Sequence, residues 1–298
     1  MVYFFSGSKN ATGAALATGY RNTNIVLGII VIIIMAICVF SIVEINPPTQ
    51  SAGKSSLVKD ISSLVKNKYY IMFLGEVFFL FLGYLSMYGA MQYYYTYIVG
   101  DVSGMSLALT LLTLLAIPTM ILAAYLNGKG IAKIKLIQFG AIVDIIGYAI
   151  LFFTSDGTIA TAALGLIGLG FGFRSSMFFS MMPDIFDYTE WQVGRNLGGT
   201  QNAIQGFVNK VSSAAASAIV SALLVWGNYD ASKLDKAIAD GVDIATKYPQ
   251  THTAINFAFG GLALVSTVMA VVVLLPYDLD KKYPQIRADL DKRHKENA

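Results

Sequence analysis

The stretch PDIFDYTEWQVGRNLGGTQNAIQGFVNK, residues 183–210, determines how the rest of the chain is interpreted. It is a polar interruption between two long apolar segments. Asp184, Asp187 and Glu190 are three residues apart, so a helical turn would place them on one face. An arginine and a glycine pair follow, and the next apolar segment contains Lys210. An acidic turn, a glycine hinge and a lysine inside an apolar helix predict a functional element rather than an ordinary loop.

The composition predicts an all-α polytopic membrane protein. Hydrophobic residues make up 55% of the chain and charged residues 13%, and the mean hydropathy is +0.60. Soluble domains carry about 25% charged residues. The apolar residues also form blocks of roughly 20, the length that spans a bilayer core. A net charge of +3 is too small to indicate a nucleic-acid partner.

The apolar blocks predict seven membrane spans. They cover residues 25–43, 69–91, 105–126, 134–153, 158–182, 203–225 and 253–275. If the segment after the first span is cytoplasmic, 14 of the 21 Lys and Arg residues lie on the cytoplasmic side and five on the other. This positive-inside bias predicts a cytoplasmic C-terminal tail.

A family resemblance rests on motif residues around the acidic turn. They are Pro183, Asp184, Asp187, Tyr188, Glu190, Gly194, Arg195, Gly198 and Lys210. This pattern resembles the glycoside–pentoside–hexuronide:cation symporters, the melibiose-permease-like branch of the major facilitator superfamily. Those transporters carry a D-x-x-D-Y-x-E loop between their tenth and eleventh helices and a lysine on the eleventh.

The resemblance implies a domain organisation. Family members have twelve helices in two six-helix bundles, and the seven spans here correspond to helices six to twelve. We therefore expect residues 1–45 to hold an extracytoplasmic segment and a remnant sixth helix of the N-terminal bundle. Residues 46–68 would form the central cytoplasmic loop, 69–275 the C-terminal six-helix bundle and 276–298 a cytoplasmic tail. Met1 is interpreted as an internal methionine of a longer ancestral protein or the start of a fragment from a truncated gene.

The resemblance also implies a function. It predicts a plasma-membrane symporter that moves a glycoside, pentoside or hexuronide with sodium or protons and needs no other cofactor and no metal. The family's cation site lies on N-terminal helices, so we expect no transport by this chain alone. Its partner would be a missing N-terminal bundle or another copy. The alternative is a membrane scaffold or regulatory half-transporter. An enzyme is a weaker interpretation, because no nucleophile–base pair is evident.

Four charged residues fall inside the predicted spans, namely Glu76, Asp144, Arg174 and Lys210. A charge at that depth costs about 2.5–3.5 kcal/mol on insertion scales. With a rise of about 1.5 Å per residue, all four lie roughly 10–14 Å from the cytoplasmic ends. They are predicted to form a neutral cluster with Asp144–Arg174 as its main pair. Separate snorkelling or hydration of each charge is the alternative.

Two polar faces are candidates for the substrate and cation pathway. Lys210 matches the lysine of the family's eleventh helix, and the resemblance implies a role near the sugar and cation. Its neighbours Asn202, Gln205 and Asn209 recur at helical spacing. A snorkelling lysine near a helix end is the alternative.

The second face belongs to residues 69–91 and the residues just after them. Tyr84, Tyr88, Gln92 and Tyr95 share one helical face that would suit a sugar. A packing stripe that runs into an interfacial aromatic belt explains the same residues.

The acidic turn has two interpretations. Asp184, Asp187, Tyr188 and Glu190 could form a cytoplasmic gate that pairs with Arg195 or with the lysine-rich central loop, as the family suggests. They could also form a solvated cap on the next helix. Residues 278–298 alternate in charge and are predicted to form a surface helix without a site. Gly168 and Gly172 have the GxxxG spacing of closely packed membrane helices.

Overall fold

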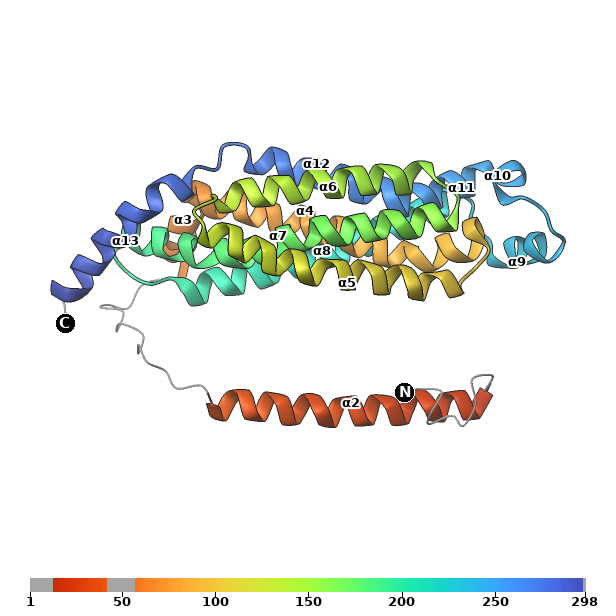
Figure 1. Ribbon diagram of the computed structural model, residues 1–298, viewed down its shortest axis with the longest axis horizontal. Coiled ribbons are helices and arrows are strands. Elements are labelled where there is room, and N and C mark those ends of the chain that lie inside the picture. The colour runs from red at the N-terminus through yellow and green to blue at the C-terminus, as the bar shows by residue number, and fades with distance from the viewer. Residues whose placement is uncertain (1–12, 42–56, 297–298) are drawn as a thin grey trace. The chain divides into compact units, whose positions relative to one another are not determined.

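The computed structural model describes residues 13–41 and 57–296, and all regular structure within them is helical (Figure 1). The chain divides into two units, residues 1–51 and 52–298. The first unit contributes helix α2 (Gly13–Ser41). The helices of the second are α3 (Leu57–Lys66), α4 (Lys68–Tyr94), η1 (Tyr95–Val99), α5 (Ser103–Gly128), α6 (Lys133–Phe153), α7 (Gly157–Val193), α8 (Gly198–Trp226), α9 (Ala231–Ala239), α10 (Ile244–Lys247), α11 (Pro249–Asn256), η2 (Phe257–Gly261), α12 (Leu262–Leu274) and α13 (Leu279–Glu296).

Seven helical segments of the described residues are long and apolar enough to cross a membrane. They are α2, α4 with η1, α5, α6, α7, α8, and α11 with η2 and α12. This confirms the predicted fold class, although the boundaries differ. α7 continues to Val193 instead of ending near residue 182. Residues 46–56 of the expected central loop lie outside the described residues, and the described part of this loop contains α3.

Local signals explain where the long helices begin and end. The Asn67 side chain accepts hydrogen bonds from the backbone N–H groups of Tyr69 and Tyr70, which caps α4. Asp156 caps α7 in the same way. α7 ends at Gly194, whose φ of 77° is the left-handed conformation that glycine adopts without strain.

Glycines let α5 and α6 approach opposite sides of α7. A Cβ at Gly168 would lie 2.2 Å from the Leu112 carbonyl oxygen of α5, and one at Gly172 would lie 2.4 Å from the Ala116 oxygen. On the other side, a Cβ at Gly170 would lie 2.5 Å from the Gly140 oxygen of α6. Backbone contact of this kind confirms the predicted packing role of Gly168 and Gly172.

The second unit contains two apolar cores, one toward each end of its helices. One core includes Met87, Tyr94, Leu151 and Phe259. It lies toward the end that carries α9 and α10 (Figure 1). The other core lies toward the opposite end, which carries α3 and α13 and is called the tail end below. Ile286 and Leu290 of α13 are buried in this second core, so the C-terminal helix is part of the folded unit.

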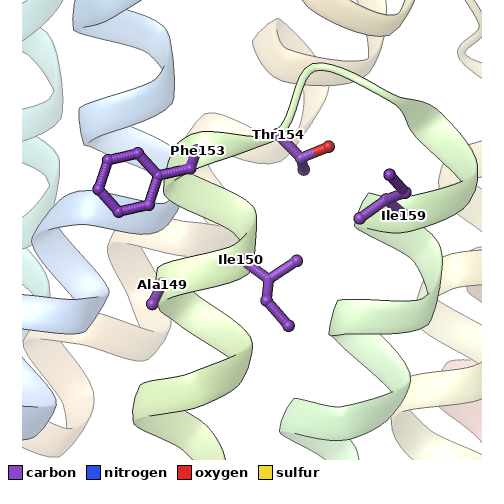
Figure 2. A pocket seen from close by; sticks show the side chains of 5 residues that line it. All are labelled: Ala149, Ile150, Phe153, Thr154 and Ile159. Carbon is purple, nitrogen blue, oxygen red and sulfur yellow. The ribbon is translucent and has the colours of Figure 1, made fainter.

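A hollow on the outer surface of α6 and α7 is apolar. Ala149, Ile150, Phe153, Thr154 and Ile159 line it (Figure 2). The Phe153 side chain is 81% exposed. A wall of this composition suits a lipid chain and offers few hydrogen-bonding groups to a polar solute.

We predict that Gly168→Ala destabilises the bundle by about 1–3 kcal/mol, because the new methyl group would overlap backbone of α5. Gly206→Ala is the matched control, because Gly206 also lies within a helix and a Cβ there meets nothing within 4 Å. That control should be neutral or stabilise by up to about 1 kcal/mol. Unfolding of the purified variants in detergent measures both changes. Equal stability of the two variants would show that close α5–α7 contact is not required.

Candidate functional site

A buried arginine joins three helices of the second unit. Arg174 on α7 donates from Nη1 to Asp144 Oδ2 on α6 at 3.0 Å, and from Nη2 to Glu76 Oε1 on α4 at 2.9 Å. All three side chains are 2–3% exposed. The predicted Asp144–Arg174 pair is confirmed, and Glu76 is the second partner of the same guanidinium. We call these three residues the charge triad.

The charge triad does not include Lys210, so the predicted four-residue cluster was wrong in that respect. Lys210 is exposed on α8. No ion pair or hydrogen bond joins it to another residue of the described chain. Matched depth along the helices was the basis of that prediction, and depth alone does not specify which face of α8 the lysine occupies.

Small residues make room for the charge triad. A Cβ at Gly170 would lie 2.2 Å from Asp144 Oδ1, and one at Gly140 would lie 3.0 Å from Arg174 Cγ. The glycines that bring α6 against α7 therefore also admit the ion pair between them. On α6, Asp144 lies between the residues of the two apolar cores. The charges thus occupy the junction of two apolar regions, where water has little access.

The candidate aromatic face of α4 is only partly buried. The Tyr84 and Tyr88 hydroxyl groups are 2.9 Å apart and hydrogen bonded. The Tyr84 ring stacks on Phe171 of α7 with a centroid distance of 4.8 Å. Tyr88 is 36% exposed, and Gln92 is exposed one turn further along. Tyr95, the fourth residue of this stripe, is buried. The stripe therefore divides into a packed part and an accessible part.

The polar residues of α8 are only partly on the side that the rest of the second unit leaves unburied. Gln201, Ser212, Ala216, Val220 and Leu224 form the buried side of this helix. Asn202 and Lys210 are exposed, whereas Gln205 and Asn209 lie next to the buried side and are half-buried. That this polar stripe of α8 lines a cavity together with the α4 tyrosines stays a prediction.

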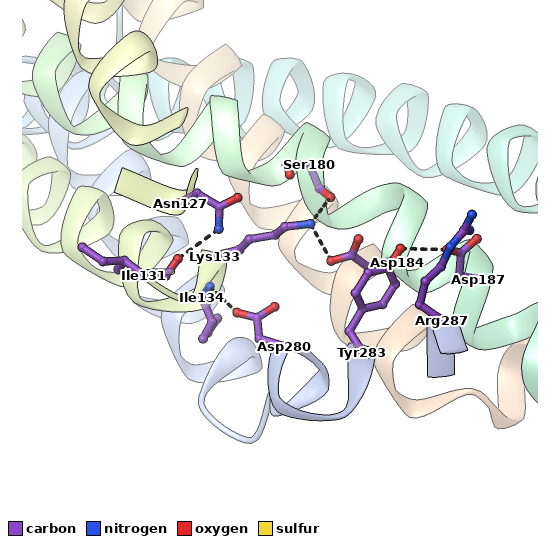
Figure 3. Close-up of polar contacts among 10 residues, drawn as sticks. All are labelled: Asn127, Ile131, Lys133, Ile134, Ser180, Asp184, Asp187, Asp280, Tyr283 and Arg287. Carbon is purple, nitrogen blue, oxygen red and sulfur yellow. Dashed lines mark hydrogen bonds and ion pairs between the residues drawn. The ribbon is translucent and has the colours of Figure 1, made fainter. Parts of the chain in front are cut away.

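The acidic residues of the predicted loop lie within the last turns of α7, so their assignment to a loop was wrong. Their placement on consecutive turns of one helix is as predicted. Lys133 of α6 donates to Asp184 Oδ2 at 2.6 Å and to the Ser180 carbonyl oxygen at 2.8 Å (Figure 3). Asp184 is thus held by the start of α6, and the predicted partners at residues 46–56 of the central loop lie outside the described residues.

The C-terminal helix α13 holds the other two acidic residues. Tyr283 and Arg287 donate to Asp187 Oδ2 at 2.8 and 3.1 Å (Figure 3). His294 Nε2 lies 2.6 Å from Glu190 Oε1. The sequence predicted a surface helix without a site for this tail. The helix is present, but its assignment as uninvolved was wrong because it carries partners of the acidic motif.

Arg195 pairs with Asp60 of α3. The gate prediction joined Arg195 to the acidic motif or joined that motif to the lysines of the central loop. Instead, the central segment contributes an acid to the arginine. α3 is therefore tied to the α7–α8 connection through a pair that the sequence analysis missed.

Another tail-end contact links α4 to the start of α13. Tyr69 donates to Asp278 Oδ1 at 2.5 Å, and Lys282 lies 2.7 Å from Asp278 Oδ2. Hydrogen bonds from Lys282 and Tyr69 hold the pKa of Asp278 well below its usual range. The Tyr188 ring of the acidic motif packs edge-on against Tyr69. The Asp278 carboxylate of this contact therefore stays ionised in acidic solution.

A buried hydrogen-bond junction at the tail end was also missed. Asn67 Nδ2 and Gln201 Nε2 donate to Thr189 Oγ1 at 2.8 and 2.9 Å, and Tyr70 donates to the Gln201 carbonyl oxygen at 2.8 Å. These residues join α4, α7 and α8. The available sequence signal was Asn67, a capping residue directly before a long apolar run.

Comparison with known proteins identifies the family. Residues 1–281 match the family of MFS/sugar transport proteins. The chain belongs to this family. It is a family of transporters and not of enzymes, which confirms the predicted melibiose-permease-like membership of a multi-pass membrane protein.

Three curated relatives support this assignment. The isoprimeverose transporter of Lactiplantibacillus pentosus is 25% identical over 303 aligned positions, which cover 100% of this chain and 59% of the relative. The inner membrane symporter YicJ of Escherichia coli is 26% identical over 89% of this chain and 54% of the relative. The glucuronide carrier protein homolog of Escherichia coli is 22% identical over 96% and 60%. The chain therefore spans between half and two thirds of the length of these relatives.

For this family member we predict that Arg174→Gln lowers the free energy of unfolding by about 3–5 kcal/mol, because it leaves the acidic groups of Glu76 and Asp144 buried without their cation. Arg287→Gln is the control. It also removes an Arg–Asp pair, but Arg287 is 51% exposed, so a loss of about 0–1 kcal/mol is expected. Denaturant or thermal unfolding in detergent compares them. If Arg174→Gln lowered the free energy of unfolding as little as Arg287→Gln does, a structural role for the charge triad would be contradicted.

Proposed function

We propose that this chain provides the C-terminal six-helix bundle of a symporter that carries a glycoside, pentoside or hexuronide across the cell membrane together with a cation. The family match over residues 1–281 carries this proposal. The printed names of two relatives, an isoprimeverose transporter and a glucuronide carrier homolog, support a sugar derivative as the substrate.

The proposed domains follow the helices. α2 would belong to the N-terminal bundle, α3 to the central segment, α4 to α12 to the C-terminal bundle and α13 to the tail. The excess of basic residues at the tail end supports a cytoplasmic location for α3 and α13. The membrane would be the plasma membrane, in keeping with the inner membrane location in the name of the YicJ symporter.

The proposed substrate and cation pathway runs along the polar sides of α4 and α8. Tyr84, Tyr88 and Gln92 would provide aromatic and amide contacts to the sugar. Asn202, Gln205, Asn209 and Lys210 would provide polar contacts from α8. Support comes from Asn202 and Lys210, which are exposed on α8 because this unit does not bury them. Polar side chains facing lipid are costly, so this side suits a water-filled cavity or a partner bundle.

The acidic motif would brace the cytoplasmic end of the bundle. Asp184 contacts α6, Asp187 and Glu190 contact α13, and Tyr188 packs on α4. Arg195 holds α3. Alternating access moves one bundle against the other as rigid bodies, so a braced end would let these helices move together.

The first test of this proposal supplies a partner bundle. The N-terminal bundle of the isoprimeverose transporter would be fused to this chain. The fusion should take up labelled glycoside when an imposed sodium or proton gradient drives uptake. Lys210→Ala should reduce uptake about tenfold, equivalent to about 1.4 kcal/mol. Lys236→Ala on the exposed side of α9 is the control and should leave uptake unchanged. A folded, monodisperse fusion that takes up no glycoside would contradict the proposal and favour a scaffold or regulatory half-transporter.

The 298-residue chain alone should show no gradient-driven uptake in liposomes, because alternating access needs two bundles around a central site. Its unburied polar side should instead favour association with another membrane protein or a second copy. Uptake of labelled glycoside by the purified chain alone, abolished by Lys210→Ala, would overturn the need for a partner while supporting the role of the lysine.

A further inference from the structure

The charge triad has an unbalanced charge if all its groups are ionised. One guanidinium carries +1 and two carboxylates carry −2, which leaves a net charge of −1 among side chains that are 2–3% exposed. Burial of an uncompensated charge is costly, and two carboxylates that share a site rarely both ionise. One bound proton would make the charge triad neutral.

The unused atoms of the charge triad offer a place for that proton. Glu76 Oε2, Asp144 Oδ1 and Arg174 Nε are buried and have no hydrogen-bond partner. Each carboxylate uses its other oxygen to accept from the same guanidinium. A free carboxylate oxygen therefore remains on each side of Arg174, on α4 and on α6.

The neighbouring elements provide no other charge that could neutralise the charge triad. α5 and α12, which pack against α7 and against α4 and α6, contain no Asp, Glu, Lys, Arg or His. Lys210 of α8 is exposed and makes no ion pair with the described residues. Tyr148 is buried one turn after Asp144 on α6, and a neutral phenol brings no positive charge.

A metal cation fits this place less well than a proton does. The guanidinium between the two carboxylates repels a second cation. Among residues 13–41 and 57–296, no group of three or more His, Cys, Asp or Glu residues could hold a metal ion. A proton needs only one carboxylate oxygen and binds covalently there.

The tyrosines of α4 connect the charge triad to the accessible surface. Tyr88 is 36% exposed, and its hydroxyl is hydrogen bonded to that of Tyr84. The Tyr84 ring in turn stacks on Phe171, the residue after Gly170, where a Cβ would lie 2.2 Å from Asp144 Oδ1. This pair starts at the proposed sugar pathway and leads toward the buried carboxyls.

We propose that Glu76 and Asp144 together bind one proton beside Arg174, and that Tyr88 and Tyr84 form its route from the substrate side. A role of this proton in transport rests on the proposed function, whereas the proton site can be tested without any sugar.

Infrared spectroscopy of the purified chain in a maltoside detergent, which contains no carbonyl group, tests the site. At about pH 6, exposed carboxyls are ionised, since their ordinary pKa values are about 4. The unsubstituted protein should still show the carbonyl stretch of one protonated carboxyl. Glu76→Gln and Asp144→Asn should each remove this band, because the remaining carboxylate is then balanced by Arg174. Asp240→Asn, an exposed carboxyl between α9 and α10, should leave it unchanged.

The proposal is overturned if the unsubstituted protein has no such band, or if the band survives either single substitution. Should a variant fail to fold, carboxyl-labelled aspartate and glutamate in the unsubstituted protein replace it. Labelling must then shift the band, and a band insensitive to both labels would exclude Glu76 and Asp144.

The route is tested by hydrogen–deuterium exchange of the same band. Tyr84→Phe removes the hydroxyl but keeps the ring that stacks on Phe171, so exchange should slow several-fold. Tyr283→Phe at the tail end is the matched control and should not slow it. Equal exchange in Tyr84→Phe and in the unsubstituted protein would overturn the tyrosine route. A protonated carboxyl without glycoside uptake by the fusion would refute the transport proposal and leave the proton site standing.

Discussion

The contact of one guanidinium with two carboxylates is the constraint on which the arrangement of the second unit depends. Arg174 ties α7 to both α4 and α6 through residues far apart in the chain. Each buried ion pair is costly to desolvate and is tolerated only with well-formed hydrogen bonds. The three helices must therefore keep the positions that satisfy the charge triad, and the glycines at 140 and 170 make those positions accessible.

Polar contacts of two kinds stabilise the middle of the unit and its tail end. The charge triad is surrounded by apolar cores and specifies how α4, α6 and α7 pack. The tail end instead uses partly exposed pairs, in which α13 and α3 hold the end of α7 and the α7–α8 connection. Exposed pairs contribute little each, so their effect depends on several acting together. Asn202, Gln205, Asn209 and Lys210 of α8 have no such partners among the described residues.

The sequence predicted much of the fold because membrane spans carry strong local signals. Seven apolar segments, the α7 glycines and the Asp144–Arg174 pair all followed from spacing and the cost of buried charge. Not all partners across long separations followed. Glu76 was predicted in the same cluster as Arg174, whereas the contacts of α13 with Asp187 and Glu190 depend on tertiary packing and were missed. The end of α7 was misplaced because Pro183 and the acidic residues resemble a loop, although burial of Asp184 beside Lys133 keeps this segment helical.

A double-mutant cycle across the charge triad tests the central claim most directly. Unfolding would be measured for Arg174→Gln, for the pair Glu76→Gln with Asp144→Asn, and for the combination of all three substitutions. If the guanidinium links the helices through these carboxylates, the combined variant loses less stability than the sum of the two separate losses, by roughly 0.5–3 kcal/mol or more. Strictly additive losses would show that the three side chains do not act together and would contradict the account.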